Sequence, residues 1–215
     1  MAMKFEELLK IVDDEPVFES ALLLAGSVEP VDIRRQLSRW AQTGRIYQLR
    51  RGLYMLSEPY RKKELHPFAV ANRMVRGSYV SCQSALSYYG LIPEFTANVT
   101  SVTLQRPGRW ETKLGVFEFR HVKADFFHGY RLTELGGNQY GFLATSEKAL
   151  LDLIHLQPGG DSPDYLRELR LQAIDRFDMS AFLRLAESSH SPKLIRSARR
   201  LLQILEEDEE GYKVL

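Results

Sequence analysis

The stretch from Pro30 to Gly44 constrains the fold most, because it carries two chemically different faces at helical spacing. Proline suits the first turn of a helix and glycine favours helix termination, so the sequence predicts a helix between these two residues. On a helical wheel the apolar side chains gather on one side, and these are Ile33, Leu37, Trp40 and Ala41. That side is expected to pack against a core, which leaves the other side in solvent.

Two shorter helices are expected before this one. The first has apolar residues at helical spacing and closes near Pro16; its apolar residues are Phe5, Leu8, Leu9 and Val12. The second lies within residues 18–26, FESALLLAG, where Gly26 supplies a stop. Its expected buried stripe consists of Phe18, Ala21, Leu22 and Ala25.

A hairpin is expected directly after the third helix. Residues 45–56, RIYQLRRGLYML, read as two short strands around Arg50, Arg51 and Gly52, because glycine adopts the backbone angles of a tight turn. Three helices followed by a hairpin is the element order of a winged helix-turn-helix. We therefore predict a winged-helix DNA-binding domain over residues 1–59.

The charge of the chain is segregated, although the whole sequence sums to only +1. Between Val31 and Lys63, nine basic residues and the two acids Asp32 and Glu58 leave a net charge of +7. The basic residues are Arg34, Arg35, Arg39, Arg45, Arg50, Arg51, Arg61, Lys62 and Lys63. Acidic residues in the first thirty positions and in the tail 206–210 offset this concentration. A segregated basic segment is typical of a phosphate-binding surface.

The polar side of the third helix combines cations with side chains that hydrogen-bond base edges. We predict a DNA-binding surface made by Arg34, Arg35, Ser38, Arg39 and Gln42, extended by Arg50 and Arg51 at the hairpin tip. The alternative is an ordinary solvated helix face. The order of helices, the scarcity of acids and the second arginine cluster favour DNA.

The rest of the chain predicts a second domain over residues 60–215, so that the protein is α+β overall. The lysine-rich stretch YRKKELHP resembles a linker before a short helix over residues 68–74. A helix capped by Ser81 and closed by Gly90 follows. Strands are expected over 99–105, 115–122 and 140–145 in a mainly antiparallel sheet, with RPGRW as a turn between the first two. The remainder predicts helices over 146–156, 164–177, 179–187 and 192–207.

A second candidate basic patch lies on the last helix, where Lys193, Arg196 and Arg200 fall along one face. It suits nucleic acid or an acidic partner. The interpretation that we favour is a solvated face or a face paired with the acidic tail.

The sequence of the second domain contains no recognisable catalytic motif. His121, Asp125 and His128 lack a recognised metal-ligand spacing, and Ser81, Cys82 and Ser84 lack an identifiable base. Glu147 and Asp152 do not share a helix face, and Glu147 is interpreted as a favourable charge in a first turn. Gly136 and Gly137 form a turn signal and no phosphate-binding loop. We therefore expect no enzyme, metal or cofactor.

The composition indicates the class of the protein and the cellular compartment that it suits. With 44% hydrophobic and 27% charged residues it is an ordinary globular sequence. Cys82 is its single cysteine, which fits a reducing compartment. Neither a secretory signal nor an apolar stretch of bilayer length is present, so we predict a cytoplasmic protein without a membrane partner.

Three segments in order carry a family resemblance. They are QLSRWAQTGRIYQLRRGLYML (36–56), VANRMVRGSYVSCQSALSYYGLIPE (70–94) and ATSEKALLDLIHL (144–156). Together they resemble the AbiEi family of antitoxins from type IV toxin–antitoxin systems. The resemblance implies a winged helix that represses its own operon by binding inverted repeats in the promoter. It also implies a second domain that counters a nucleotidyltransferase-like toxin, with no need for direct contact.

On that pattern the arginines of the third helix and of the hairpin serve autoregulation, and the region from about Leu65 onward serves antitoxicity. A solitary regulator whose second domain binds a ligand or mediates assembly is the first alternative. Candidate ligand contacts for it are Tyr88, Tyr89, Phe117 and Phe119, although such aromatic residues more often form a core. A nucleic-acid-processing enzyme ranks last.

Overall fold

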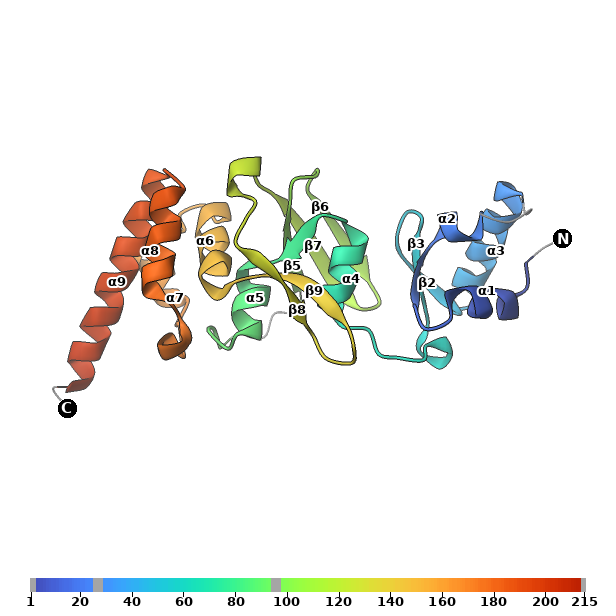
Figure 1. The fold of residues 1–215 in the computed structure, drawn as a ribbon, viewed down its shortest axis with the longest axis horizontal. Helices are drawn as coiled ribbons and strands as arrows, with labels where there is room; N and C mark the ends of the chain where they lie inside the picture. Colours follow the sequence, from blue (N-terminus) through green and yellow to red (C-terminus); the bar gives the residue numbers. More distant parts are fainter. Residues whose placement is uncertain (1–2, 25–28, 94–97, 214–215) are drawn as a thin grey trace.

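The computed structural model describes residues 3–24, 29–93 and 98–213. The fold is α+β with two sheets, one of three strands and one of six. In Figure 1 the molecule is elongated: the small sheet and the first helices lie at one end, the large sheet lies in the middle, and the last helices lie at the other end. Within the described ranges, no helix combines the length and apolar character that crossing a membrane requires.

The N-terminal unit, residues 3–56, contains the helix of Pro30 and the hairpin at the predicted places. Its elements are α1 (Phe5–Val12), β1 (Val17–Glu19), α2 (Ser20–Leu23), α3 (Pro30–Gln42), β2 (Ile46–Arg50) and β3 (Leu53–Leu56). The strands pair antiparallel in the order β1-β3-β2.

The prediction for the second helix is wrong at its start and in its buried stripe, because Ala21 and Leu22 are exposed and Leu23 is buried instead. Phe18 lies in β1, where it pairs with Tyr54 of β3, and the helix begins only at Ser20. A short apolar run fits a buried strand and a buried helix equally well, so pairing with β3 decides the outcome. Ala25 and Gly26, the expected last turn and stop of this helix, lie outside the described residues.

The three-stranded sheet is covered on both faces. The strand residues in the core around α1 and α3 include Phe18, Tyr54 and Leu56. The strand residues in the core of the following part of the chain include Val17, Leu53 and Met55. Burial of one such side chain contributes roughly 1.5–3 kcal/mol, so apolar packing holds the two parts together. Because both faces need apolar residues, the strand Leu53–Leu56 does not alternate between apolar and polar side chains.

The C-terminal unit, residues 67–213, is built on a mixed sheet with the strand order β6-β7-β5-β4-β9-β8. Its strands are β4 (Ser78–Val80), β5 (Asn98–Thr103), β6 (Gly108–Thr112), β7 (Gly115–His121), β8 (Tyr130–Glu134) and β9 (Tyr140–Ala144). Its helices are α4 (Pro67–Met74), α5 (Cys82–Tyr88), α6 (Ser146–Leu156), α7 (Pro163–Glu168), α8 (Met179–Ser188) and α9 (Pro192–Lys213). The pairs β5–β7 and β4–β9 are parallel, and the other three pairings are antiparallel.

Three element predictions in this unit need correction. The RPGRW segment is a turn only at its start, because Gly108 already begins β6. Strand β8 was not predicted; it pairs with β9 through a turn at Gly136 and Gly137, both with positive φ. The helix expected over residues 164–177 ends at Glu168, before residues 170 and 173 adopt positive φ.

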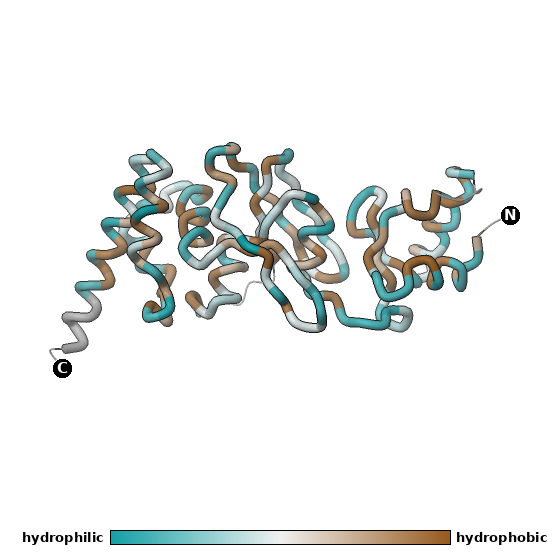
Figure 2. The backbone as a smooth tube through the Cα atoms, viewed as in Figure 1, coloured by the Kyte–Doolittle hydropathy of each residue, from teal (hydrophilic) through white to brown (hydrophobic). Residues whose placement is uncertain are grey.

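The linker, residues 57–66, connects the two units and contains a short 3₁₀ helix over Glu58–Tyr60. Figure 2 shows it as a hydrophilic stretch between more apolar elements. Pro59, where we predict the domain boundary, lies within that 3₁₀ helix.

Candidate nucleic-acid interface

Helix α3 is fixed to the N-terminal core by one face. Pro30 occupies its first turn, and Ile33, Leu37 and Trp40 are buried with at most 4% of their surface exposed. The Trp40 ring meets the Phe5 ring of α1 edge to face, with centroids 5.4 Å apart. This packing sets the rotation of the helix, so the opposite face is presented outward.

The outward face of α3 carries the five residues that the sequence predicts. All are exposed: Arg34, Arg35, Ser38, Arg39 and Gln42. Arg35 makes a loose ion pair with Asp32 of the first turn at 3.8 Å, with 79% of the arginine side chain exposed. The α3 face, as we call these five residues, is therefore accessible to a large polyanion.

The hairpin turn presents one of its two arginines. Gly52 has φ +80°, a conformation that glycine adopts without strain, and this lets β2 turn into β3. Arg51 beside it is exposed. Its position in an exposed turn leaves its guanidinium able to contact an external phosphate.

Arg50 departs from the prediction. Its Nε donates a hydrogen bond to the Met74 carbonyl oxygen at the end of α4, and its Nη1 donates to the Arg51 carbonyl oxygen at 3.3 Å. The side chain is half-buried and ties the hairpin to the C-terminal unit. Arg50 and Arg51 therefore do not act as one exposed cluster.

Other cations of the basic segment are also engaged within the molecule. Lys62 pairs with Asp13 and with Asp14, the latter at 3.2 Å, and Lys63 pairs with Glu15 at 3.3 Å. Arg61 pairs with Glu58, and the Arg45 guanidinium lies 5.1 Å from the centre of the Phe5 ring. The local charge of +7 is thus divided between an outward face and internal contacts.

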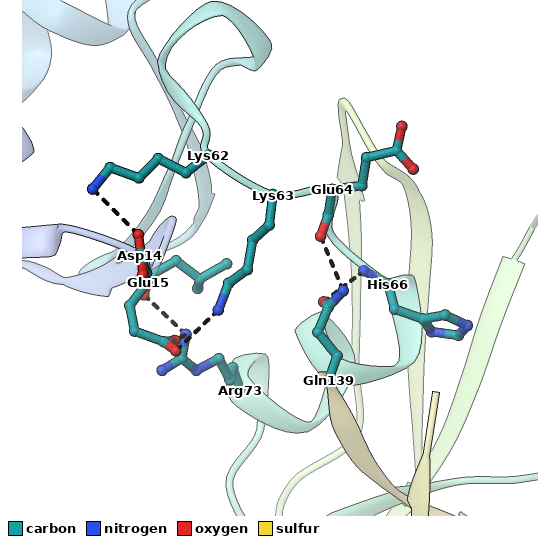
Figure 3. Close-up of polar contacts among 9 residues, drawn as sticks. Asp14, Glu15, Lys62, Lys63, Glu64, His66, Arg73 and Gln139 are labelled. Atoms are coloured by element: carbon teal, nitrogen blue, oxygen red, sulfur yellow. Dashed lines mark hydrogen bonds and ion pairs between the residues drawn. The ribbon is translucent and has the colours of Figure 1, made fainter. Parts of the chain in front are cut away.

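The lysine pairs belong to a polar junction between the units, shown in Figure 3. Arg73 of α4 and Lys63 both form ion pairs with Glu15, so one carboxylate pairs with two cations. On the other side of the linker, the Gln139 side-chain amide accepts from His66 N–H at 2.9 Å and donates to the Glu64 carbonyl oxygen at 3.0 Å. The acids near the N-terminus, which offset the charge in the sequence, therefore bind the linker.

The second basic patch holds α9 in place. Lys193 Nζ donates to the carbonyl oxygens of His155 and Gln157, and Arg196 pairs with Asp161 at 3.0 Å. Arg200 is exposed. Two of the three predicted cations therefore have partners within the C-terminal unit, and neither set of partners belongs to the acidic tail.

A buried polar cluster in the C-terminal unit was missed by the sequence analysis. Lys148 and Asp152, one turn apart on α6, form an ion pair in which both side chains are 0% exposed. Ser81 Oγ donates to Asp152 Oδ2 at 2.7 Å, and Tyr79 Oη donates to the same oxygen at 3.1 Å. A lysine and an aspartate four residues apart in the otherwise apolar run of residues 148–154 were the available signal. Ser81 stands at the N-cap of α5 as predicted, but its hydroxyl serves Asp152 and makes no cap hydrogen bond.

Burial dominates the electrostatics of this cluster. Removal from water lowers the pKa of Lys148 and raises the pKa of Asp152, and the attraction within the pair opposes both shifts. The Lys148 ammonium also lies 3.8 Å from the centre of the Phe126 ring. Because Ser81 is fully buried, its hydroxyl has no open path to a substrate. The cluster connects α6 to β4 and the start of α5.

The remaining catalytic candidates are dispersed or engaged. Among the described residues, no three histidine, cysteine, aspartate or glutamate side chains gather as a metal site, and His121 instead contacts the Gln105 carbonyl oxygen. Ser84 Oγ donates a hydrogen bond to the Asn98 carbonyl oxygen and accepts one from the Thr100 N–H. Burial raises the pKa of the Cys82 thiol, which disfavours a thiolate. Glu147 lies in the first turn of α6, where it accepts from Ser146 Oγ and Asp178 N–H.

The four aromatic residues proposed for ligand contact separate into two kinds. Phe117 and Phe119 are core residues with at most 1% exposure. Tyr89 is half-buried and donates to the Ala144 carbonyl oxygen at 2.9 Å, whereas Tyr88 is 42% exposed and lines a cavity. Tyr88 is therefore the most accessible of the four.

Comparison with known proteins gives no assignment: no family model matches this chain, and no curated protein matches it.

Proposed function

We propose that the N-terminal unit is a winged helix-turn-helix and that it binds double-stranded DNA with α3 as its recognition helix. The observation that carries this proposal is the α3 face, on which three arginines, a serine and a glutamine are exposed opposite a buried apolar side. The element order supports it, since α1, α2 and α3 precede the β2–β3 hairpin.

The residues of the α3 face suit both tasks of a recognition helix. The major groove of B-DNA is wide enough to admit an α-helix, and its base edges pair with arginine and glutamine side chains. Arg34, Arg35 and Arg39 also neutralise phosphates, which supplies affinity without reading sequence. In this arrangement Arg51 extends the contact to the flanking backbone, and Arg50 holds the hairpin against the C-terminal unit.

A gel-shift titration with the DNA upstream of the coding sequence tests this proposal. The unmodified chain is expected to bind, and the combined variant Arg34→Ala, Arg35→Ala and Arg39→Ala is expected to bind at least about a hundred-fold more weakly. A matched control removes three exposed arginines of the C-terminal unit, Arg109, Arg167 and Arg184. Binding that survives in the first variant and weakens only in the control would place the interface elsewhere.

We further propose that the chain is an autorepressor and antitoxin of a type IV toxin–antitoxin system. The support is the ordered resemblance to AbiEi antitoxins in segments 36–56, 70–94 and 144–156. The operator would be inverted repeats in its own promoter. The C-terminal unit would counter a nucleotidyltransferase-like toxin, with or without contact.

Coexpression with a neighbouring nucleotidyltransferase-like gene tests the antitoxin role. The unmodified chain and the α3 variant are both expected to restore growth, because repression and antitoxicity reside in different units. Growth arrest in the presence of the folded, unmodified chain would remove the antitoxin role and leave DNA binding intact.

One observation favours a second candidate, a regulator whose C-terminal unit senses a small ligand. Tyr88 lines a cavity of ≈ 700 Å³ beside the linker. A shift in melting temperature with a small ligand would distinguish this candidate from the antitoxin.

A further inference from the structure

A cavity of ≈ 700 Å³ lies where α4 and α5 meet the start of β5 and the turn between β6 and β7. This volume is within the range of small-molecule sites in proteins. Six of the residues that line it are His66, Phe68, Ser87, Tyr88, Lys113 and Leu114. Of these residues only His66 also takes part in the polar junction, through its backbone N–H, whereas its ring belongs to the cavity.

Aromatic rings form one side of this cavity. The ring centroids of His66 and Phe68 are 5.0 Å apart, and those of Phe68 and Tyr88 are 5.8 Å apart. Tyr88 is 42% exposed, although it is a large apolar ring beside other rings. Three adjacent rings with accessible surface favour a planar aromatic guest, because stacked and edge-to-face contacts add to apolar burial.

The polar groups of the cavity favour a negative charge on that guest. Lys113 carries the one formal charge among the described lining residues, and it is exposed. His66 Nδ1 accepts the Phe68 N–H at 3.2 Å, so the neutral ring keeps its hydrogen on Nε2 as a donor. Ser84, another lining residue, is already bonded to the backbone of Asn98 and Thr100.

We propose that this cavity binds a planar aromatic carboxylate. The aromatic ring of the ligand lies among His66, Phe68 and Tyr88, and its carboxylate pairs with Lys113. Removal from water lowers the pKa of His66, which keeps the imidazole neutral near pH 7 and makes Lys113 the cation of the site. The assignment is independent of DNA binding, since no residue of the α3 face lines the cavity.

Titration of the full chain with indole-3-acetate, without DNA, tests the proposal through amide chemical shifts. Saturable shifts are expected at Phe68, Tyr88, Lys113 and Leu114. Indole, which has the ring without the charge, is expected to bind the unmodified chain about three-fold more weakly than indole-3-acetate does. The Lys113→Met variant is expected to bind indole-3-acetate about three-fold more weakly than the unmodified chain does. Acetate, which lacks the ring, is expected to cause no saturable shift.

Variants of the aromatic wall complete the test. Tyr88→Ala is expected to weaken binding about five-fold, whereas Tyr88→Phe keeps the ring and the affinity. Tyr140→Ala removes an exposed tyrosine elsewhere and is expected to change nothing. The proposal is overturned if the cavity amides show no saturable shift, or if Tyr88→Ala and Lys113→Met both bind as tightly as the unmodified chain. Lys113 and Tyr88 are exposed, so both variants are expected to fold, and the amide spectrum verifies this.

Discussion

Helices α3 and α6 place cations in opposite surroundings. On α3, three arginines lie in solvent on one face, and among the described residues only Arg35 forms an ion pair, with Asp32 at 3.8 Å. On α6, Lys148 is fully buried and pairs with Asp152 one turn away. An exposed cation retains its hydration and its attraction for distant anions, whereas a buried one depends on the partner beside it. Residues of similar charge therefore remain available to an external partner on one helix, the DNA of the proposed function, and hold the fold together on the other.

The polar junction stands between these two cases. Its ion pairs join segments far apart in sequence, such as Lys63 with Glu15, and their side chains are partly exposed. Pairs of this kind contribute at most about 1 kcal/mol each. The apolar contacts of Val17, Leu53 and Met55 therefore supply most of the attraction between the units, and the ion pairs fix the path of the linker.

The largest effect is expected when the buried pair loses one partner. Lys148→Met leaves the Asp152 carboxylate buried without its cation, so the free energy of unfolding should fall by about 3–5 kcal/mol. Urea unfolding of the full chain measures it. The double variant Lys148→Met, Asp152→Leu should recover much of the loss, because it removes both charges. A loss below about 1 kcal/mol in the single variant would mean that Asp152 does not depend on Lys148.

The next largest effect concerns the salt dependence of the proposed DNA contact. Each phosphate neutralised by a cation contributes about 0.9 to the slope of log K against log salt concentration. Replacing Arg34, Arg35 and Arg39 by alanine should therefore lower this slope by up to about 3 if all three contact phosphate. The melting temperature should hardly change, since these side chains are exposed. An unchanged slope would mean that the α3 face contacts no phosphates.

The same comparison marks what the sequence predicts and what it does not. The amphipathic pattern of residues 30–44 predicts both the helix and the exposure of Arg34 and Arg39, because helical spacing is a local property. The partner of Arg50 is the carbonyl oxygen of Met74, which local spacing does not identify. The buried pair of Lys148 and Asp152 was missed for the same reason. Asp152 is held by Tyr79 and Ser81, and Lys148 lies against the Phe126 ring, all outside α6. Local faces were predictable, and tertiary partners were not.

A smaller effect should separate the two hairpin arginines. Arg50→Ala removes the hydrogen bond to the Met74 carbonyl oxygen, so the unfolding free energy should fall by about 1 kcal/mol. Arg51→Ala should leave stability unchanged and weaken DNA binding several-fold, because its side chain is exposed beside the turn. Urea unfolding and gel shift on both variants measure the two quantities. If Arg50→Ala weakened DNA binding more than Arg51→Ala without loss of stability, the assignment of the two residues would be reversed.

The smallest effect is a pH dependence that arises in the C-terminal unit and the linker, away from the α3 face. Removal from water lowers the pKa values of His66, His128 and His155; Lys148 lowers the latter two further, and Asp152 opposes this. The unfolded chain therefore takes up protons first as the pH falls below about 7, so the unfolding free energy should decrease between about pH 7 and pH 5. Urea unfolding across this range measures the slope of the unfolding free energy against pH. The variant His155→Gln should reduce this slope. The control variant His190→Gln, on an exposed loop, should leave it unchanged. A stability that rises toward pH 5 would mean that Asp152 outweighs the loss of water around these rings, and the buried pair would then control the histidines near it.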